Sequence, residues 1–267
     1  MRAFLGALAG AALIALAASA THAQIDYRNL DDDRPTRVED AYPVERFAFE
    51  FLIPYSVERG RSGATLHASV LELEYGVVRN GQLGLKAPLG VVREAGTTES
   101  GLSGLRVFGL YNFNTESRLL PALSLRTDVT FPVGGLAGSE TQIALKALAT
   151  RSWGRNRLHV NAAFRFGPDG TPAAVEALDR WWYGVAVDRT LFRQSLLLVG
   201  EAYARKLTDG APVEVNASLG LRWQVRTTTV LDIGIGRRLR SDVGPHYAVT
   251  VGISNAFALA GLMPRGR

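Results

Sequence analysis

Two side chains near the start of the sequence, His67 and Ser69, are the first that could catalyse a reaction. Residues two apart on an extended strand share a face, so His67 could serve as the base for a nucleophilic Ser69. Such a hydrolase needs a third group to orient the histidine, and Asn80 follows only in the next turn. His159 and Asn161 also share a face, but no serine stands beside them. We therefore predict that the chain is not an enzyme, and we keep ester hydrolysis as an alternative.

Other chemistries find little support in the residue types. The chain has no cysteine, and its histidines and carboxylates do not show the spacing of metal ligands. The stretch Gly234-Ile235-Gly236 lies inside an alternating segment and precedes no helix, which argues against a nucleotide-binding loop. The net charge of +5 is not gathered into a basic block. We expect no cofactor, no metal and no nucleic-acid partner.

The stretch that decides the fold is VEVNASLGLRWQV, residues 213–225. Its odd positions are all apolar and its even positions are polar or glycine, so a strand here has one apolar face and one polar face. Strands of soluble proteins usually have about five or six residues, whereas a membrane-spanning strand needs roughly nine to eleven. The length of this alternation favours a strand with lipid on one side and water on the other.

The beginning of the chain has the features of an export signal. Residues 1–23 contain Arg2, an apolar Ala-rich run and a small-residue exit at Thr21-His22-Ala23. After residue 23 there is no run of about 18 apolar residues, although 47% of the chain is hydrophobic. An outer-membrane β-barrel reconciles these facts, because its hydrophobicity is spread over alternate positions. We expect an exported protein of a Gram-negative outer membrane.

Alternating segments recur along the rest of the chain. They predict an all-β fold, a transmembrane antiparallel up-and-down β-barrel of about 12 strands, an even number as is usual for bacterial single-chain barrels. The expected strands are residues 46–58, 65–78, 82–92, 105–114, 119–131, 141–152, 157–167, 180–191, 195–206, 213–225, 229–239 and 246–257.

Short and long connections alternate between these segments. Every second one is short, as at Arg79-Asn80-Gly81, which is a signal for a tight hairpin. The others are mostly longer and rich in Gly, Pro and Ser, as at residues 94–104 and 168–179. Short periplasmic turns and longer extracellular loops are typical of outer-membrane barrels. Outer-membrane lipids and lipopolysaccharide are therefore the expected surroundings, and the basic loops could contact their anionic groups.

If the apolar face meets lipid, the polar face lines a lumen. Mixed charges there predict a network of ion pairs, a weakly selective aqueous path, or both. The lumen-lining candidates are Glu50, Glu72, Glu74, Lys86, Arg126, Asp128, Lys146, Arg165, Asp188, Glu201, Arg205, Glu214, Arg222, Asp232 and Arg238. The polar segment 24–43 is either periplasmic or a plug of this lumen, with Asp33, Arg34, Pro35 and Glu39 as plug candidates.

The junction DRPTRVEDAYPVERFAFEF, residues 33–51, resembles the start of the outer-membrane barrels in the transporter family of the MetA pathway of phenol degradation. The matching residues are Asp33, Arg34, Pro35, Glu39, Val44, Phe47 and Glu50, and they cover under a tenth of the chain. The resemblance implies a transport barrel with no catalytic residues. The last strand carries Asn255 where an aromatic is common in the signal that the barrel assembly machinery reads, and ALAGLMPRGR follows Phe257.

These observations predict four parts: a signal peptide (1–23), a polar N-terminal segment (24–43), a transmembrane barrel (44–257) and a C-terminal tail (258–267). We expect a porin-like channel or transporter for small solutes, aromatic or apolar ones among them, that works by passive diffusion through a polar lumen. The alternative is a structural or adhesive surface barrel that acts through its loops. A third interpretation is an outer-membrane lipid hydrolase. The sequence identifies neither the solute nor the oligomeric state.

Overall fold

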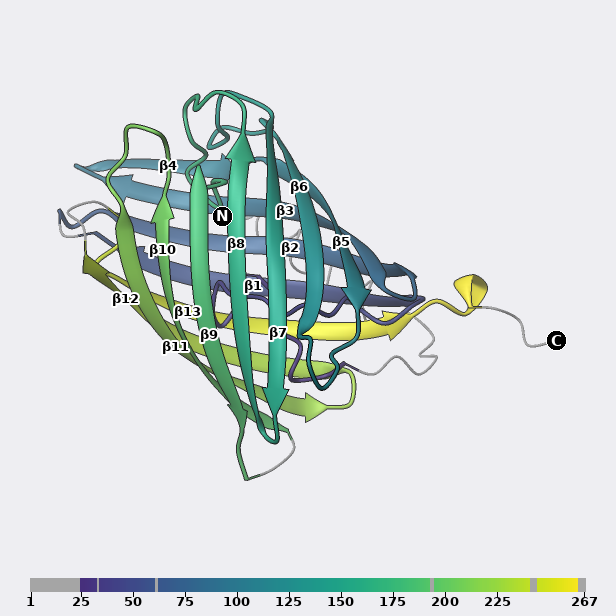
Figure 1. Ribbon diagram of the computed structural model, residues 1–267. Helices are drawn as coiled ribbons and strands as arrows, with labels where there is room; N and C mark the ends of the chain where they lie inside the picture. Colours follow the sequence, from purple (N-terminus) through teal and green to yellow (C-terminus); the bar gives the residue numbers. More distant parts are fainter. Residues whose placement is uncertain (1–24, 33, 61, 193–194, 241–243, 264–267) are drawn as a thin grey trace.

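The computed structural model of the chain describes residues 25–32, 34–60, 62–192, 195–240 and 244–263. The predicted signal peptide and Asp33 lie outside the described residues. Strands make up nearly all of the regular structure (Figure 1). Their bounds are β1 Ala48–Arg59, β2 Thr65–Val78, β3 Gly81–Glu94, β4 Thr97–Leu102, β5 Leu105–Asn114, β6 Ala122–Phe131, β7 Gln142–Trp153, β8 Asn156–Phe166, β9 Trp181–Thr190, β10 Leu196–Lys206, β11 Glu214–Arg226, β12 Thr229–Arg240 and β13 Tyr247–Ala258.

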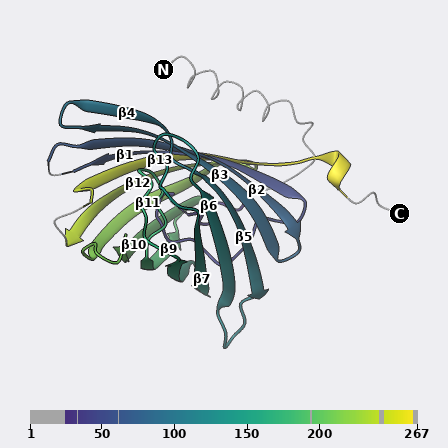
Figure 2. The ribbon, with the colours of Figure 1, turned by 90° about the horizontal axis from the view of Figure 1, so that it is seen from above.

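The sheet is antiparallel and closes on itself. Neighbouring strands pair in chain order, and β1 closes the circle against β13 over the whole register from Ala48↔Ala258 to Arg59↔Tyr247. The result is a closed barrel of 12 strands with one additional strand, which confirms the predicted transmembrane β-barrel. Figure 2 shows the sheet curving round from another side.

The additional strand is β4, and the sequence analysis did not predict it. Residues 97–102 were expected to be part of a long loop, but they pair with Leu89–Glu94 of β3. The first half of β3, Gly81–Lys86, pairs instead with β5. The β3–β4 hairpin therefore extends the sheet beyond the barrel rim. Its sequence, TTESGL, carries too few apolar residues to show the alternation of a lipid-facing strand.

The burial pattern of the strands is inverted compared with a soluble protein. In β6 every second side chain is buried and the ones between are mostly exposed, as the period of a strand requires. The exposed positions are apolar, such as Ile235 (60% exposed) and Val187 (53%). The largest fully buried side chains include Arg126, Arg165 and Arg222. Charged groups therefore fill the interior and hydrophobic groups form the outer face.

The two rims of the barrel differ. One rim, called here the turn rim, carries the short turns such as Arg79-Asn80 and Gly154-Arg155, and both ends of the barrel chain. The opposite, loop rim carries the longer connections, of which 167–180 between β8 and β9 is the longest. The predicted asymmetry of turns and loops is thus present, although the β5–β6 connection on the turn rim, residues 115–121, is longer than predicted.

Helical structure is scarce. Ala260–Leu262 form a short 3-10 helix after the last strand. In the described residues, no helix has the length and apolar character needed to cross a membrane.

Candidate functional site

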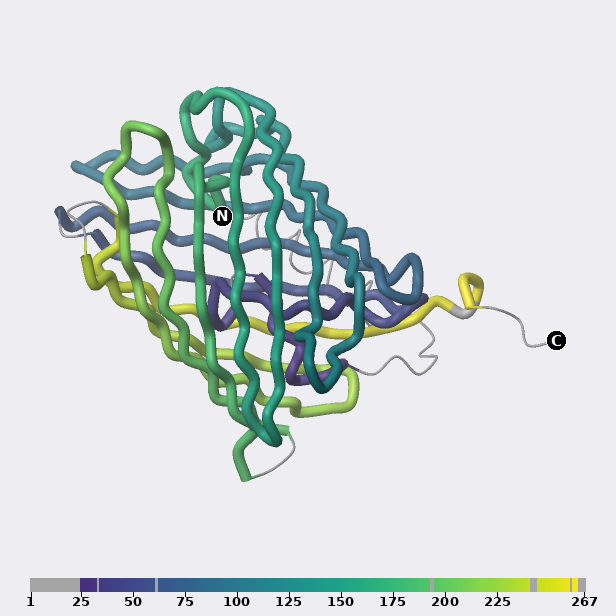
Figure 3. Tube along the Cα trace, in the orientation of Figure 1, coloured from purple at the N-terminus to yellow at the C-terminus, as the bar shows by residue number. Residues whose placement is uncertain are grey.

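The interior of the barrel is occupied by the N-terminal segment, defined here as residues 25–47, which precedes β1. It enters at the turn rim, where the amide of Ile25 donates to the carbonyl of Thr227. Figure 3 shows its tube, in purple, crossing the barrel between the strands. Leu30 and Val38 of this segment are buried in an apolar cluster with inward-facing residues of β9, β10, β12 and β13. The segment that the sequence left as periplasmic or plug therefore lies inside the lumen.

Wall side chains bind the backbone of the segment directly. One carboxylate oxygen of Glu201 accepts the amides of Arg37 and Val38, at 2.8 and 2.9 Å. The side-chain amide of Asn161 both accepts from the amide and donates to the carbonyl of Glu39, each at 2.9 Å. Because a buried peptide group without a partner is costly, these contacts are what allow an irregular segment to lie here.

Further along the segment the same pattern continues. The carbonyl of Ala41 accepts hydrogen bonds from Asn112 Nδ2 at 2.8 Å and from Ser124 Oγ at 2.5 Å. Gln82 Oε1 accepts from the amide of Val44 at 2.6 Å. Short polar side chains on β3, β5 and β6 thus replace the water or strand partner that the segment's backbone would otherwise need.

Glycines on the inner wall give the segment room. A Cβ atom added at Gly220 would come within 2.5 Å of the Pro35 ring, and one at Gly234 within 2.4 Å of the Pro35 carbonyl oxygen. At Gly184 an added Cβ would lie 2.7 Å from Val38. These distances are too short for any larger residue, so the glycines at these strand positions permit close approach of the segment.

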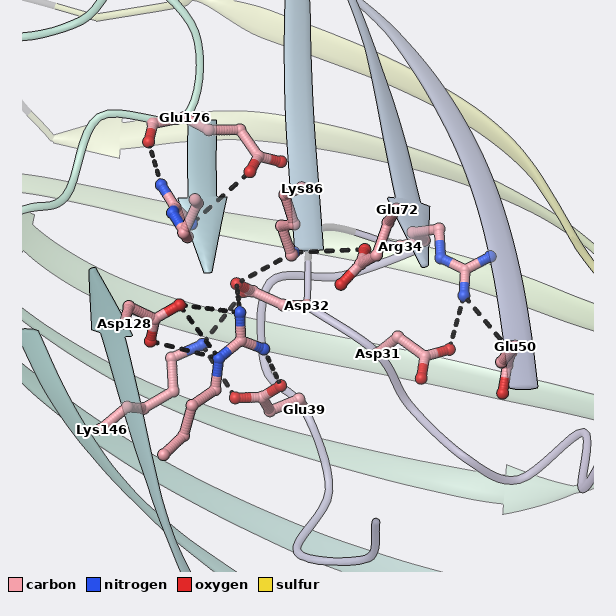
Figure 4. A network of polar contacts seen from close by, with 12 residues as sticks. Asp31, Asp32, Arg34, Glu39, Glu50, Glu72, Lys86, Asp128, Lys146 and Glu176 are labelled. Atoms are coloured by element: carbon pink, nitrogen blue, oxygen red, sulfur yellow. Dashed lines mark hydrogen bonds and ion pairs between the residues drawn. The ribbon is translucent and has the colours of Figure 1, made fainter. Parts of the chain in front are cut away.

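An ion-pair network joins the segment to the wall near the middle of the barrel (Figure 4). Asp32 lies 3.1 Å from Lys146 Nζ, 3.5 Å from Lys86 Nζ and 3.6 Å from Arg126 Nη2. Glu39 of the segment lies 2.7 Å from Arg126 and 3.1 Å from Lys146. Two carboxylates of the segment are therefore held between three cations of β3, β6 and β7.

At Asp32, the attraction of neighbouring cations outweighs the effect of burial on the pKa. Burial by itself raises the pKa of a carboxyl group, but Lys146, Lys86 and Arg126 hold the pKa of Asp32 well below its usual range. The charged form of Asp32 is thus stabilised by the wall. Its contribution to stability is present above the pKa of the unfolded chain and is lost as the pH falls through the lowered, folded value.

A second group of charges lies beside the first. The Arg34 guanidinium is 2.6 Å from Asp31, 3.5 Å from Asp232 of β12 and 3.9 Å from Glu50 of β1. Arg222 of β11 reaches the same Asp31 oxygen at 3.2 Å. Arg34, a plug candidate of the sequence analysis, therefore bridges the closing seam of the barrel from inside.

A third group joins a hydroxyl, an imidazole and a carboxylate. Thr150 Oγ1 lies 3.0 Å from His159 Nδ1, and His159 Nε2 lies 2.9 Å from Asp188 Oδ2. The order resembles that of a hydrolase triad, but His159 and Asp188 are fully buried and Thr150 accepts the amide of Ala41 at 3.0 Å. We interpret this chain of hydrogen bonds as a further attachment of the N-terminal segment.

The loop between β8 and β9 also enters the lumen, from the opposite rim. We call residues 173–179 the inserted loop. Ser103 Oγ accepts the amide of Val175 at 2.8 Å, and Arg106 lies 3.5 Å from the Glu176 carboxylate. Asp179 lies 3.7 Å from Arg37 and 3.8 Å from Arg205. The inserted loop therefore narrows the lumen on the loop side of the N-terminal segment.

Cavities remain on both sides of the segment. A cavity of about 200 Å³ lies towards the loop rim, between the inserted loop, Pro35–Arg37 and the inner faces of several strands. Towards the turn rim there are cavities of about 360 and 590 Å³. The network around Asp32 and Glu39 lies between these cavities.

The candidates named from the sequence take the following places. Arg205 is partly buried, and the other lumen-lining candidates are buried inside the barrel. Many of them contact the N-terminal segment, whereas Arg165 pairs with Asp169 of the loop above it, and Arg238 donates to the carbonyl of Gly244. Of the plug candidates, Arg34, Pro35 and Glu39 lie in the lumen.

Several interior residues were not named from the sequence. Arg157 reaches Asp40 at 3.1 Å and Asp188 at 2.6 Å, and its place on the polar face of an alternating strand could have suggested it. Glu176 and Asp179 could not have been found in this way, because they lie in a loop without periodicity. Arg106 follows the break after β4, where the alternation begins anew.

The residues considered for ester hydrolysis do not converge. Ser69 Oγ donates to the Pro54 carbonyl at 3.1 Å, and His67 Nδ1 lies 2.8 Å from the hydroxyl of Tyr55. Asn80 lies in the turn after β2, at the rim opposite His67. The three groups therefore form no catalytic arrangement.

The fold is similar to that of solved outer-membrane barrels. No family model and no curated protein matches the chain. The COG4313 outer membrane channel from Pseudomonas putida F1 is similar with a TM-score of 0.62 at 14% identity, over 82% of this chain and 98% of that chain. The KdgM porin gives 0.55 at 11% identity, over 78% and 99%, and the NanC porin gives 0.54 at 8% identity, over 77% and 98%. The barrel therefore has the fold of outer-membrane porins.

Proposed function

We propose that this protein is an outer-membrane channel for small solutes, in which the N-terminal segment sets the resistance of the lumen. The observation that carries the proposal is a closed barrel with a charged interior, cavities open towards both rims, and one segment across the middle. Solved proteins of similar fold are named as channels and porins, which supports it. The resemblance of residues 33–51 to the MetA-pathway transporters supports the same role.

The orientation and surroundings follow from the two rims. In an outer membrane the turn rim faces the periplasm and the loop rim faces outside. We propose that residues 1–23 direct export, that outer-membrane lipids and lipopolysaccharide contact the apolar face, and that the barrel assembly machinery inserts the chain. The proposed solute then enters at the inserted loop.

The solute class is suggested by the cavity at the loop rim. One part of its lining is apolar, with Pro54, Leu66 and Val70 of β1 and β2. Another part carries Arg37, Arg205 and the ring of Tyr203. Aromatic and apolar groups fit the first part and a polar group fits the second. We therefore propose small solutes with an aromatic or apolar body, which move by passive diffusion.

The mechanism consists of a passage with one constriction. A solute diffuses freely to the level of Pro35 on one side and to the level of Asp40 on the other, because cavities reach both residues. Between these levels the N-terminal segment crosses the lumen, and the charges of Asp32 and Glu39 are paired with the wall. Passage requires this part of the segment to shift.

The proposal is tested by conductance in planar bilayers, with the mature chain compared with a deletion of residues 25–43. Removal of the segment should raise the single-channel conductance several-fold, since the constriction is removed. If the deletion does not fold, the double variant Asp32→Asn/Glu39→Gln loosens the same contacts without changing shape. Glu99→Gln, on the exposed strand β4, is the matched control.

The results separate the alternatives. Unchanged conductance in both variants would refute the role of the segment as the constriction. A barrel that stays closed but retains binding to cells or surfaces would instead favour the adhesive interpretation. Liposome uptake of small aromatic and aliphatic solutes of equal size then tests the proposed solute class.

A further inference from the structure

We propose that Asp31, Glu50 and Glu74 bind a divalent metal cation that fastens the N-terminal segment to the first two strands. The three side chains come from different elements: Asp31 from the segment, Glu50 from β1 and Glu74 from β2. One carboxylate oxygen of each lies within 4.8 Å of the others. Such a separation suits three oxygens that share one ion.

The register of the sheet places two of these carboxylates directly opposite each other. Glu50 and Glu74 are paired residues of β1 and β2, and both face the lumen. Like charges at such a cross-strand pair destabilise the sheet. Both side chains are almost completely buried, at 3% and 2% exposed, so water cannot screen them. The pair therefore needs a positive group between or beside its carboxylates.

The described protein groups do not provide enough positive charge. Glu74 Oε2 and Glu50 Oε1 are buried and have no hydrogen-bond partner in the described part of the chain. Arg34 reaches Glu50 only at 3.9 Å and is engaged more closely by Asp31 and Asp232. A buried carboxylate that is left without a partner costs several kcal/mol in general, so an unsatisfied pair points to a missing ligand.

The local charge balance indicates the charge of that ligand. Within the described ranges, the carboxylates joined here are those of Asp31, Glu50, Glu74 and Asp232, and the cations that contact them are Arg34 and Arg222. With all four carboxylates ionised, the excess of negative charge is two. A divalent cation neutralises it, whereas a single monovalent cation leaves one charge over.

The donor type and the access route narrow the choice of ion. Carboxylate oxygens are hard ligands that favour Ca²⁺ and Mg²⁺ over softer metals. Glu50 also lines the cavity of about 360 Å³ at the turn rim. That cavity gives a hydrated ion a way in from this side and leaves water molecules to complete its coordination. The irregular origin of the ligands favours Ca²⁺, which tolerates variable geometry better than Mg²⁺.

The sequence analysis expected no metal, and the reason for the difference is the topology. Asp31, Glu50 and Glu74 lie far apart in the chain, so they do not form a local motif with the spacing of metal ligands. Only the entry of the N-terminal segment beside β1 and β2 brings them together. This inference does not depend on the proposed channel function.

The test uses the full mature protein in detergent, freed of metal with a chelator. Isothermal titration with CaCl₂ and with MgCl₂ should give saturable binding of one ion per chain, and the thermal unfolding temperature should rise with the ion. Glu74→Gln keeps the shape and removes one charge, and it should weaken Ca²⁺ binding at least tenfold. Glu99→Gln, an exposed carboxylate on β4, should leave the affinity unchanged. Anomalous diffraction from Mn²⁺-soaked crystals locates the ion.

Two results would overturn the proposal. One is the absence of saturable binding together with a Glu74→Gln variant that unfolds at a higher temperature than the native chain, since this would show that a proton and not a metal relieves the pair. The other is binding that Glu74→Gln and Glu99→Gln affect equally, which would assign the ion to the surface or to residual lipopolysaccharide.

Discussion

Two parts of the chain enter the lumen without being strands, and they are held in different ways. The N-terminal segment is bound through its backbone by Glu201 and Asn161, and Glu39 pairs with wall cations at 2.7 and 3.1 Å. The inserted loop is held by hydrogen bonds between Ser103 and Val175, and its charge contacts include pairs of 3.5–3.8 Å at Glu176 and Asp179. The first crosses the middle of the lumen, and the second lines its loop-side mouth.

The difference teaches where changes should affect stability and where they should affect permeation. A buried ion pair that loses one partner leaves a desolvated charge, and the cost is greater where one side chain serves several partners, as in the network around Asp32 and Glu39. Substitutions at the N-terminal segment should therefore alter folding and conductance together. Substitutions at the inserted loop should alter permeation with a small effect on folding.

The largest effect is expected for Arg126→Met. Arg126 is 1% exposed and contacts Asp32, Glu39 and Asp128, so its loss leaves several buried carboxylates without their cation. We expect the free energy of unfolding to fall by about 3–5 kcal/mol. Guanidinium unfolding in lipid vesicles, followed by tryptophan fluorescence, measures it. A loss below about 1 kcal/mol would show that the network is solvated and that the segment is not packed as described.

A smaller loss is expected for Gly234→Val. The new side chain would begin 2.4 Å from the carbonyl oxygen of Pro35, so the N-terminal segment must move away from the wall. We expect a cost of about 1–3 kcal/mol, the usual range for overpacking, and a raised conductance. Gly200→Val is the matched control, because the nearest atom to its added Cβ is 3.8 Å away. Equal behaviour of the two variants would contradict close contact at Pro35.

At the inserted loop, Asp179→Asn should change permeation more than stability. The substitution removes the negative charge beside Arg37 and Arg205, which both line the cavity at the loop rim. We expect a smaller cost than for Arg126→Met, because Asn keeps the shape of the buried Asp179 side chain, and a shift of the reversal potential in a KCl gradient towards anion selectivity. An unchanged reversal potential would show that this cavity is not on the path of ions.

The smallest effect is expected for Asp209→Asn at the loop rim. Arg180 pairs with Asp209 at 3.0 Å, but the Asp209 side chain is 64% exposed. Such a pair contributes about 0–1 kcal/mol, and 0.5 M salt should remove most of that contribution. Vesicle unfolding at low and high salt measures it. A loss as large as that of Arg126→Met would erase the distinction between the interior and the rim.

The strands could be predicted because their period of two is written in the residue types. Val213–Val225 alternates so regularly that β11 was expected at almost its observed bounds. The same alternation predicted which charged residues face inwards, Lys86 and Arg222 among them. Strand β4 could not be predicted in this way, because it extends past the rim and has no lipid face.

The interior arrangement could be predicted only in part. Mixed charges on the inner faces suggested ion pairs, but Asp32 and Asp40 pair with strands far away in the sequence. Nothing in the local residue pattern fixes the path of an irregular segment such as residues 25–47. The glycines that admit it, such as Gly220, are also common in strands for other reasons.

One consequence follows from the way wall side chains grip the N-terminal segment. Its partners sit on strands from both ends of the barrel chain, Glu50 near the start and Asp232 and Thr250 near the end. A shift of one residue in the pairing register of any of these strands would turn the side chain that binds the segment towards the bilayer. Binding of the segment therefore stabilises the barrel only when these strands pair in the correct register, so it couples the folding of the interior to strand alignment.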